Sequence, residues 1–259
     1  MKKFLLLILS CSLFFSMQAQ YIENSEMIGI YEKLDTVLPA DARFYTEQGE
    51  LVSLVSLIDK PSVLVLVYYT CPGICSPLLD GIADVITRMD LELGEDYQIL
   101  TVSFNPEETP ELARDKKVNY VKQVKKEINE EAWMWLTGDS ANIHTLTNSV
   151  GYHFIKQGED FVHAAAIIAI SPEAKVTRYL YGTYFLPFDL KMAIVEASKG
   201  RSGPTINKVL QYCFSYDPEG KSYVFNITKV TATLILFFVA VFFIYLLFSK
   251  RKTFTKKFK

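Results

Sequence analysis

Residues suited to soft-metal or redox chemistry are scarce in this chain of 259 residues, which has four cysteines and three histidines. The sequence also lacks internal repeats, low-complexity tracts and an excess of either charge, since 27 Lys and Arg face 29 Asp and Glu. Because 50% of the residues are hydrophobic, a disordered or fibrous protein is excluded. The length allows one or two domains. The few cysteines and histidines can therefore be weighed one by one.

The first 19 residues have the layout of a secretory signal peptide. Two lysines precede the apolar run Phe4–Phe15, which Ser-Met-Gln-Ala19 follows. We expect cleavage after Ala19. Cys11 could instead belong to a lipoprotein cleavage box, but the apolar run before it is short and continues beyond it. Simple cleavage is therefore the preferred interpretation.

A second apolar run, Val230–Phe248, has 19 residues without a charge, close to the roughly 20 that cross a bilayer. It predicts a transmembrane helix; a buried core helix is the less expected alternative. The tail 249–259 carries six Lys and Arg and no acid, so by the positive-inside rule it should be cytoplasmic. The prediction is a single-pass protein of the bacterial inner membrane, in contact with membrane lipid, with residues 20–229 on the periplasmic side.

The balanced charge is an average over unlike segments. Setting aside the eight Lys and Arg of residues 1–19 and 249–259 leaves 19 basic against 29 acidic residues in 20–229, a net charge of −10. Nucleic-acid binding depends on a basic surface, so we expect no nucleic acid among the partners. A cationic partner is the better match for such a domain.

Strands and helices alternate through the middle of the chain. The β-branched and aromatic run Ser62–Tyr69 predicts a central strand buried on both faces. Ser76-Pro77 has the form of an N-cap with proline at the first helical position, so a helix should begin there. The same patterns predict strands at 97–104, 132–136, 164–170 and 176–181, helices at 110–128, 140–150 and 187–199, and hairpins turning at 48–49, 171–175 and 217–220. This alternation predicts an α/β fold with a mainly parallel sheet covered by helices.

Cys71 and Cys75 lie in the loop between the predicted central strand and its helix. This is the sheet edge at which open α/β folds place their sites, and the helix N-terminus favours thiolate over thiol. Two such thiols can form a disulfide or bind one soft metal ion. A purely structural disulfide is the alternative, although so short a loop gains little from closure. Cys213 is left over and is either buried and inert or the site of an intermolecular bond.

Two thiolates leave most metal sites incomplete, so a third ligand is expected among His144, His153 and His163. His144 falls within a predicted helix and His153 lies beside Gly151-Tyr152, where structural or solvated roles are favoured. His163 lies at a loop-to-strand junction, from which an imidazole could face the cysteine loop. Spacing alone leaves this choice open. Thiolate with imidazole suits copper or zinc rather than calcium or magnesium.

Several motifs together resemble the Sco/SenC family. They are Val-Leu-Val-Leu-Val-Tyr-Tyr-Thr-Cys71-Pro-Gly-Ile-Cys75, Thr101-Val-Ser-Phe-Asn-Pro-Glu-Glu-Thr-Pro110, Trp135-Leu-Thr-Gly-Asp139, Phe161-Val-His163 and Tyr179-Leu-Tyr-Gly182. The resemblance covers roughly residues 40–200 and implies a membrane-anchored, thioredoxin-like copper protein that helps to assemble the binuclear copper site of cytochrome c oxidase. It also implies Cys71, Cys75 and His163 as the copper ligands.

Two positions depart from the family pattern. Gly73 stands where many members carry an acid inside the cysteine loop, and Val162 stands where many carry Asp before the histidine. Members also commonly anchor at the N-terminus, whereas here a C-terminal anchor is predicted. The missing acids could change copper affinity or redox behaviour, since groups around the ligands tune both.

The leading functional hypothesis is a copper metallochaperone that passes its ion to the copper-binding subunit of cytochrome c oxidase. It implies an upstream copper donor or a thiol reductant as further partners. The main rival is a thiol–disulfide reductase in which Cys71 and Cys75 are catalytic and act on the copper-binding cysteines of the oxidase or on other extracytoplasmic disulfides. A peroxide-reducing enzyme or sensor is a third reading. The role of His163 distinguishes the first two, because a reductase needs only the cysteine pair.

Overall fold

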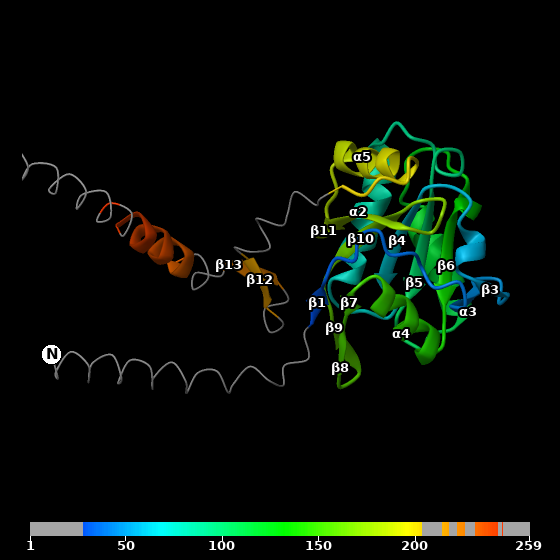
Figure 1. Ribbon diagram of the computed structural model, residues 1–259. Coiled ribbons are helices and arrows are strands. Elements are labelled where there is room, and N and C mark those ends of the chain that lie inside the picture. Colours follow the sequence, from blue (N-terminus) through cyan, green and yellow to red (C-terminus); the bar gives the residue numbers. More distant parts are fainter. Residues whose placement is uncertain (1–27, 204–213, 218–221, 226–230, 243–244, 246–259) are drawn as a thin grey trace, which may run out of the picture.

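The computed structural model describes residues 28–203, 214–217, 222–225, 231–242 and 245, and Figure 1 shows how their elements are arranged. The predicted signal peptide 1–19, Cys11, Cys213 and the predicted tail 249–259 lie outside the described residues.

The described strands and helices follow one another in the order expected of an α/β domain. They are β1 (Gly29–Ile30), β2 (Arg43–Thr46), β3 (Leu51–Ser53), η2 (Val55–Leu57), β4 (Ser62–Val67), α2 (Cys75–Arg88), β5 (Gln98–Ser103), α3 (Pro110–Val121), η3 (Glu130–Ala132), β6 (Trp133–Thr137), α4 (Ser140–Ser149), β7 (Tyr152–His153), β8 (Ile155–Gln157), β9 (Asp160–Val162), β10 (Ala166–Ile170), β11 (Val176–Tyr181), α5 (Pro187–Ala197), β12 (Phe214–Asp217) and β13 (Ser222–Phe225).

The main sheet has seven strands in the order β11-β10-β4-β5-β6-β2-β3. Only the pairs β4–β5 and β5–β6 are parallel; the other four pairs are antiparallel. The prediction of a mainly parallel sheet is therefore wrong, and the sheet is mixed. Short turns join β2 to β3 and β10 to β11, and such a connection can pair strands only in antiparallel orientation. In addition, β10 and β2 run antiparallel to β4 and β6, their other neighbours in the sheet.

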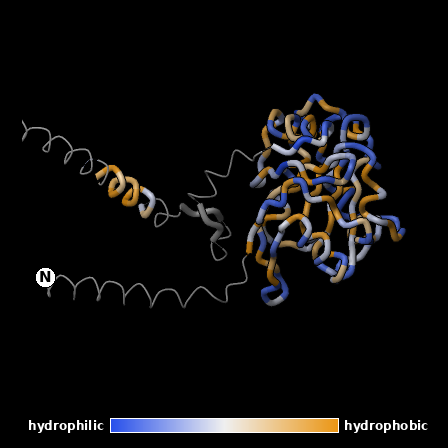
Figure 2. Tube along the Cα trace, viewed as in Figure 1, coloured by the Kyte–Doolittle hydropathy of each residue, from blue (hydrophilic) through white to orange (hydrophobic). Residues whose placement is uncertain are grey.

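Strand β4 is central, as predicted, and all six of its residues are buried. Its neighbour β5 is also buried along its whole length. Helices α2 and α5 contact each other, and α2 also contacts α3. In Figure 2, many of the hydrophobic residues, coloured orange, lie in the interior of the domain, where these strands run. Burial on both faces explains why β4 reads as a continuous apolar run and not as an alternating one.

Helix α2 begins two residues earlier than the sequence predicted, at Cys75 instead of Pro77. Its N-cap is Ile74, which makes no side-chain capping bond, so the assignment of Ser76 as N-cap is wrong. The Leu78 N–H donates to the Ile74 carbonyl oxygen at 3.1 Å and closes the first turn. Pro77 is tolerated inside this turn because the first N–H groups of a helix have no intrahelical partner. Cys75 is therefore a helical residue with a fixed orientation.

The three predicted hairpins are present, and the antiparallel pair of β10 with β11 is one of them. Strands β2 and β3 pair antiparallel around Gly49, whose φ of +88° suits glycine, and β12 pairs antiparallel with β13. The predicted helices 110–128 and 187–199 are shorter than expected, ending at Val121 and Ala197.

Residues 231–242, within the predicted span 230–248, are helical and strongly apolar (Figure 2). Among the residues that the structure describes, no helix is both long and apolar enough to cross a membrane.

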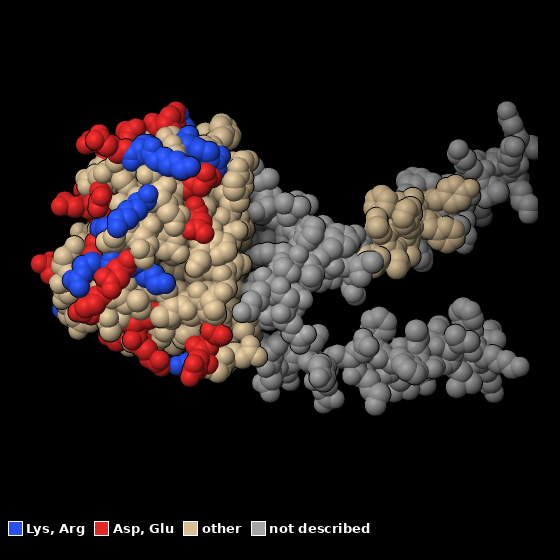
Figure 3. All heavy atoms as spheres, turned by 180° about the vertical axis from the view of Figure 1, so that it is seen from behind, with Lys and Arg blue, Asp and Glu red and all other residues tan. Residues whose placement is uncertain are grey.

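Charged side chains of both signs are interspersed on the face of the domain that Figure 3 shows. Several form ion pairs, such as Lys191 with Asp90 at 2.6 Å and Lys156 with Glu107 at 2.7 Å. Because both partners of these pairs are well exposed, each pair contributes little to stability.

Candidate metal centre

Sheet topology brings Cys71 and His163 to the same edge. The cysteine loop follows the carboxyl end of β4, and His163 lies three residues before β10 begins. Since β10 pairs antiparallel with β4, with Ile167 opposite Val65, the start of β10 lies beside the end of β4. Residues 88 positions apart in the sequence, Cys75 and His163, thereby become neighbours.

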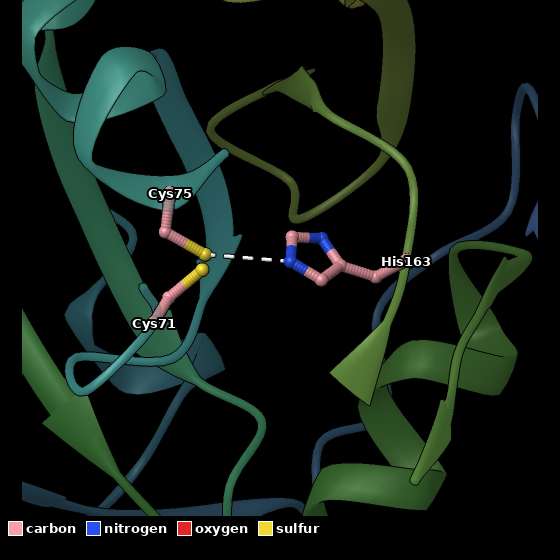
Figure 4. A group of neighbouring side chains, drawn as sticks. All are labelled: Cys71, Cys75 and His163. Atoms are coloured by element: carbon pink, nitrogen blue, oxygen red, sulfur yellow. Dashed lines mark hydrogen bonds between the residues drawn. The ribbon is translucent and has the colours of Figure 1, made fainter. Parts of the chain in front are cut away.

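The three predicted site residues form a compact cluster, shown in Figure 4. The Cys75 Sγ lies 3.5 Å from His163 Nε2, and one donor atom from each of the three residues lies within 4.8 Å of the others. Cys75 and His163 are buried, with 1% and 3% of their surface exposed, whereas Cys71 is only partly buried. Both cysteines are free thiols. The cluster is thus reachable from the Cys71 side.

The two thiols differ in acidity. A hydrogen bond from the Cys75 thiol, helped by the N–H of Gly73 at 3.3 Å from the Cys71 sulfur, holds the pKa of Cys71 well below its ordinary value. Burial, followed by the neighbouring Cys71 sulfur, raises the pKa of Cys75 well above the ordinary value. Together these shifts favour a thiolate on the accessible cysteine and a thiol on the buried one. Gly73 therefore places an N–H donor beside the sulfur, although it lacks the acid common in the family.

The His163 ring is oriented by groups on its far side. Its Nδ1 lies 2.9 Å from both the Tyr152 hydroxyl and the Ala164 carbonyl oxygen, and the same hydroxyl donates to that carbonyl at 2.8 Å. A carbonyl only accepts, so the single Tyr152 proton is used there and its oxygen can accept from Nδ1–H. We assign the proton of His163 to Nδ1, which leaves the Nε2 lone pair facing the sulfurs. Buried ligand histidines in metal sites are held in the same way.

The space beside the cluster suits a single ion. A cavity of about 10 Å³ is lined by Cys71 and His163 together with Tyr68, Gly73, Ile74, Phe161 and Val162. That volume holds roughly one water-sized atom. Ligand atoms about 2.0–2.3 Å from a tetrahedral or trigonal ion lie roughly 3.5–4 Å apart, close to the sulfur–nitrogen distance observed here. Two sulfurs and one imidazole therefore match a copper or zinc ion.

The other two histidines lie elsewhere. His144 is exposed on α4 and stacks on Phe154, with ring centroids 5.8 Å apart. His153 is partly buried against the edge of Tyr31. Both line a separate hollow of about 350 Å³ that holds neither cysteine. The structure therefore brings only His163, of the three candidates, to the cysteine pair.

Two aromatic residues of the site were missed by the sequence reasoning. Tyr152 bonds the His163 ring, and the Tyr68 ring lies edge-on to that ring with centroids 5.8 Å apart. A usable signal existed for Tyr152, because neighbouring side chains in a strand point to opposite faces. With His153 facing outward from β7, Tyr152 had to face the core.

Several solved structures are similar to this chain. A protein of Aquifex aeolicus VF5 superposes with a TM-score of 0.59 at 24% identity, covering 66% of this chain and 97% of the other. BsSco, described as a member of the Sco family of cytochrome c oxidase assembly proteins with a disulfide switch, gives 0.50 at 20% identity, with 65% and 96% covered. Arabidopsis thaliana ScoI, solved with copper bound, gives 0.49 at 22% identity, with 61% and 95% covered. No curated protein matches the chain.

The first two likenesses, at identities below 25%, support a thioredoxin-type α/β fold of the kind that Sco proteins have. The sequence model of one family, described as SCO1/SenC, matches residues 36–194. That range is more than half of the chain and contains both cysteines and His163. This chain therefore belongs to the SCO1/SenC family.

Proposed function

We propose that this protein is a membrane-anchored copper metallochaperone that binds one copper ion and delivers it to the binuclear copper site of cytochrome c oxidase. Cys71, Cys75 and His163 are the proposed ligands. The observation that carries the proposal is the position of His163 Nε2, 3.5 Å from the Cys75 sulfur. Membership of the SCO1/SenC family supports it, and BsSco is described as belonging to a family of oxidase assembly proteins.

Delivery would proceed by ligand exchange at the accessible side of the site. A thiolate of the copper-binding subunit forms a new bond to copper while Cys75 and His163 still hold the ion. The Cys71–copper bond then breaks, and Cys71 leaves as a thiolate, so the charge balances without a change of oxidation state. Partial exposure of Cys71 and burial of the other two ligands set this order.

A titration of the full-length protein in detergent with Cu(I) and with Cu(II) tests the proposal. His163→Ala should lower the copper affinity by more than about tenfold, because an imidazole ligand is lost. His144→Ala is the matched control and should bind copper as the parent does, since His144 lies apart from the cysteines. Unchanged copper binding in His163→Ala, or none in the parent, would refute the metallochaperone.

A second candidate function is thiol–disulfide reduction, which the unequal acidities of the two cysteines favour. The Cys71 thiolate would attack a target disulfide and release one target thiolate. Cys75 would then attack the mixed disulfide as its thiol proton passes to a released target thiolate. This forms a Cys71–Cys75 disulfide, breaks the mixed disulfide and releases the second sulfur of the target, so that two electrons pass to the target. Turnover of a model disulfide that is equal in the parent and in His163→Ala would favour this reaction over copper delivery.

The proposed topology places residues 20–229 in the periplasm after removal of 1–19, with 230–248 in the inner membrane and 249–259 in the cytoplasm. It is supported by the exposed apolar side chains of the helical residues 231–242, among them Leu236 and Phe238. A C-terminal tag should stay protected from protease in spheroplasts while the domain is digested. Digestion of the tag from outside would contradict this topology.

A further inference from the structure

A buried carboxylate that the proposed mechanism does not use lies behind the cysteine loop. Glu108 follows the end of β5 and immediately precedes Thr109, the N-cap of α3. Only 8% of its surface is exposed. A carboxylate in such a place requires an explanation, because burial of an ionised group is costly unless it is well hydrogen-bonded.

The two oxygens of Glu108 accept four hydrogen bonds. Oε2 accepts from the Tyr69 N–H at 2.7 Å and from the Ser103 hydroxyl at 2.6 Å. Oε1 accepts from the N–H and the hydroxyl of Thr70, each at 2.8 Å. All four partners are neutral donors, and an ionised carboxylate accepts without donating. The network therefore fits a carboxylate that keeps its full negative charge.

Three of these four donors belong to the residues that lead directly into Cys71. Tyr69 and Thr70 connect β4 to the cysteine loop, and the Cys71 N–H closes the turn by donating to the Tyr68 carbonyl at 3.2 Å. Glu108 thus ties the start of the loop to the end of β5 through Ser103. The direction in which Cys71 leaves the sheet depends on this contact.

The Glu108 charge also acts on the sulfurs. The Glu108 Oε1 accepts at 2.8 Å from the N–H of Thr70, the residue immediately before Cys71, so the charge lies close to the site. An interior carboxylate is weakly screened, so it disfavours any state of the site that carries an additional negative charge. Reduction of copper from Cu(II) to Cu(I), and reduction of a Cys71–Cys75 disulfide to a thiolate and thiol, both add negative charge here.

We propose that Glu108 is a positioning residue which fixes the entry of the cysteine loop and whose charge lowers the reduction potential of the site. For the copper couple this rests on the proposed function. For the cysteine pair it does not, so the proposal about Glu108 and the proposed metallochaperone function can fail separately.

The test uses full-length protein in detergent and two readouts. The first is the reduction potential of bound copper, followed by its visible and EPR spectra. The second, which needs no copper, is the equilibrium of the Cys71–Cys75 disulfide with glutathione, read by alkylation of free thiols. Glu108→Gln should raise the equilibrium constant for reduction about tenfold in both readouts, because a weakly screened charge is removed.

Two variants separate charge from structure. Glu107→Gln removes the same charge one residue away, where the carboxylate is 71% exposed and paired with Lys156, so neither readout should change by more than about twofold. Ser103→Ala removes the hydrogen bond from the Ser103 hydroxyl but keeps the Glu108 carboxylate, whose negative charge is then stabilised by one donor fewer. Its equilibrium constants should fall about twofold, opposite in direction to Glu108→Gln.

The outcomes are distinct. A folded Glu108→Gln with unchanged potentials, or equal shifts in Glu107→Gln, would overturn the proposal. If Glu108→Gln does not fold, Ser103→Ala is the deciding variant. A rise in its equilibrium constants for reduction would contradict the proposal that the carboxylate lowers the reduction potential. A parent protein that binds no copper would refute the metallochaperone, while the glutathione equilibrium would still test Glu108.

Discussion

Two regions of this domain contain histidine, and they differ in what holds the ring. His163 is 3% exposed, its Nδ1 is bound by Tyr152, and its Nε2 faces two sulfurs. His144 and His153 line a hollow of about 350 Å³, far larger than the 10 Å³ cavity beside the cysteines. The larger hollow offers two imidazoles but no thiolate. The kinds of donor atoms and their orientation, and not the size of the cavity, therefore identify the metal site.

Tyr152 belongs to both regions, since it lines the larger hollow and bonds the His163 ring. Its neighbour His153 faces the other way along β7. Tyr152 and His153 are adjacent in the strand, so their side chains point to opposite faces. Tyr152 orients the His163 ring, whereas His153 faces outward. Substitution of a sulfur ligand, of Tyr152 or of His153 tests this difference between the two regions.

Removal of a sulfur should have the largest effect. Cys75→Ser replaces a buried thiolate ligand by a hydroxyl, so the Cu(I) affinity should fall by more than about 100-fold. Competition with a chromogenic Cu(I) chelator measures it. Cys213→Ser is the control, since the proposal gives Cys213 no ligand role. Equal losses in both variants would show that the Cys71–Cys75 pair is not a specific site.

A smaller effect is expected at Tyr152. Tyr152→Phe keeps the ring but removes the hydroxyl that holds Nδ1–H, so the copper affinity should fall about tenfold. The same chelator competition applies, together with the EPR spectrum of the Cu(II) form. Wild-type affinity with an unchanged spectrum would mean that this hydrogen bond does not orient His163.

The smallest effect is expected at His153, and on stability instead of copper binding. Burial, then the charge of Lys33, lowers the pKa of His153. Since the folded-state pKa lies below the unfolded value of about 6.5, the unfolded chain binds the proton more tightly, and stability falls as the pH drops below that value. His153→Gln should reduce this loss between pH 7 and pH 5.5 by a fraction of a kcal/mol, measured by urea unfolding. An identical pH dependence in parent and variant would contradict the assignment.

The central part of the fold could be predicted from the sequence because its signals are local. The run Ser62–Tyr69 predicted the buried strand β4, and Gln48-Gly49 predicted the hairpin of β2 and β3. The antiparallel pairings of β10 with β4 and of β2 with β6 were not predictable in this way, because they join strands that are distant in sequence. The start of α2 was misplaced because tight folding of the cysteine loop, and not a capping side chain, sets it.

The site was predictable in part. The spacing of Cys71 and Cys75 after a buried strand predicted a thiol site, but spacing alone left His163 undecided among three histidines. The antiparallel pairing of β10 with β4 brings His163 to the cysteines, and that contact joins residues 88 positions apart. The carboxylate of Glu108 gave no sequence signal, since its hydrogen bonds depend on the approach of β4 to β5.

The most direct test of the account is the coordination of copper in the loaded full-length protein, measured by X-ray absorption at the copper edge. We predict two sulfur ligands and one imidazole nitrogen in the parent, with the imidazole contribution lost in His163→Ala and retained in His144→Ala. A parent spectrum with sulfur ligands alone, or an imidazole contribution that survives in His163→Ala, would contradict a site built from Cys71, Cys75 and His163.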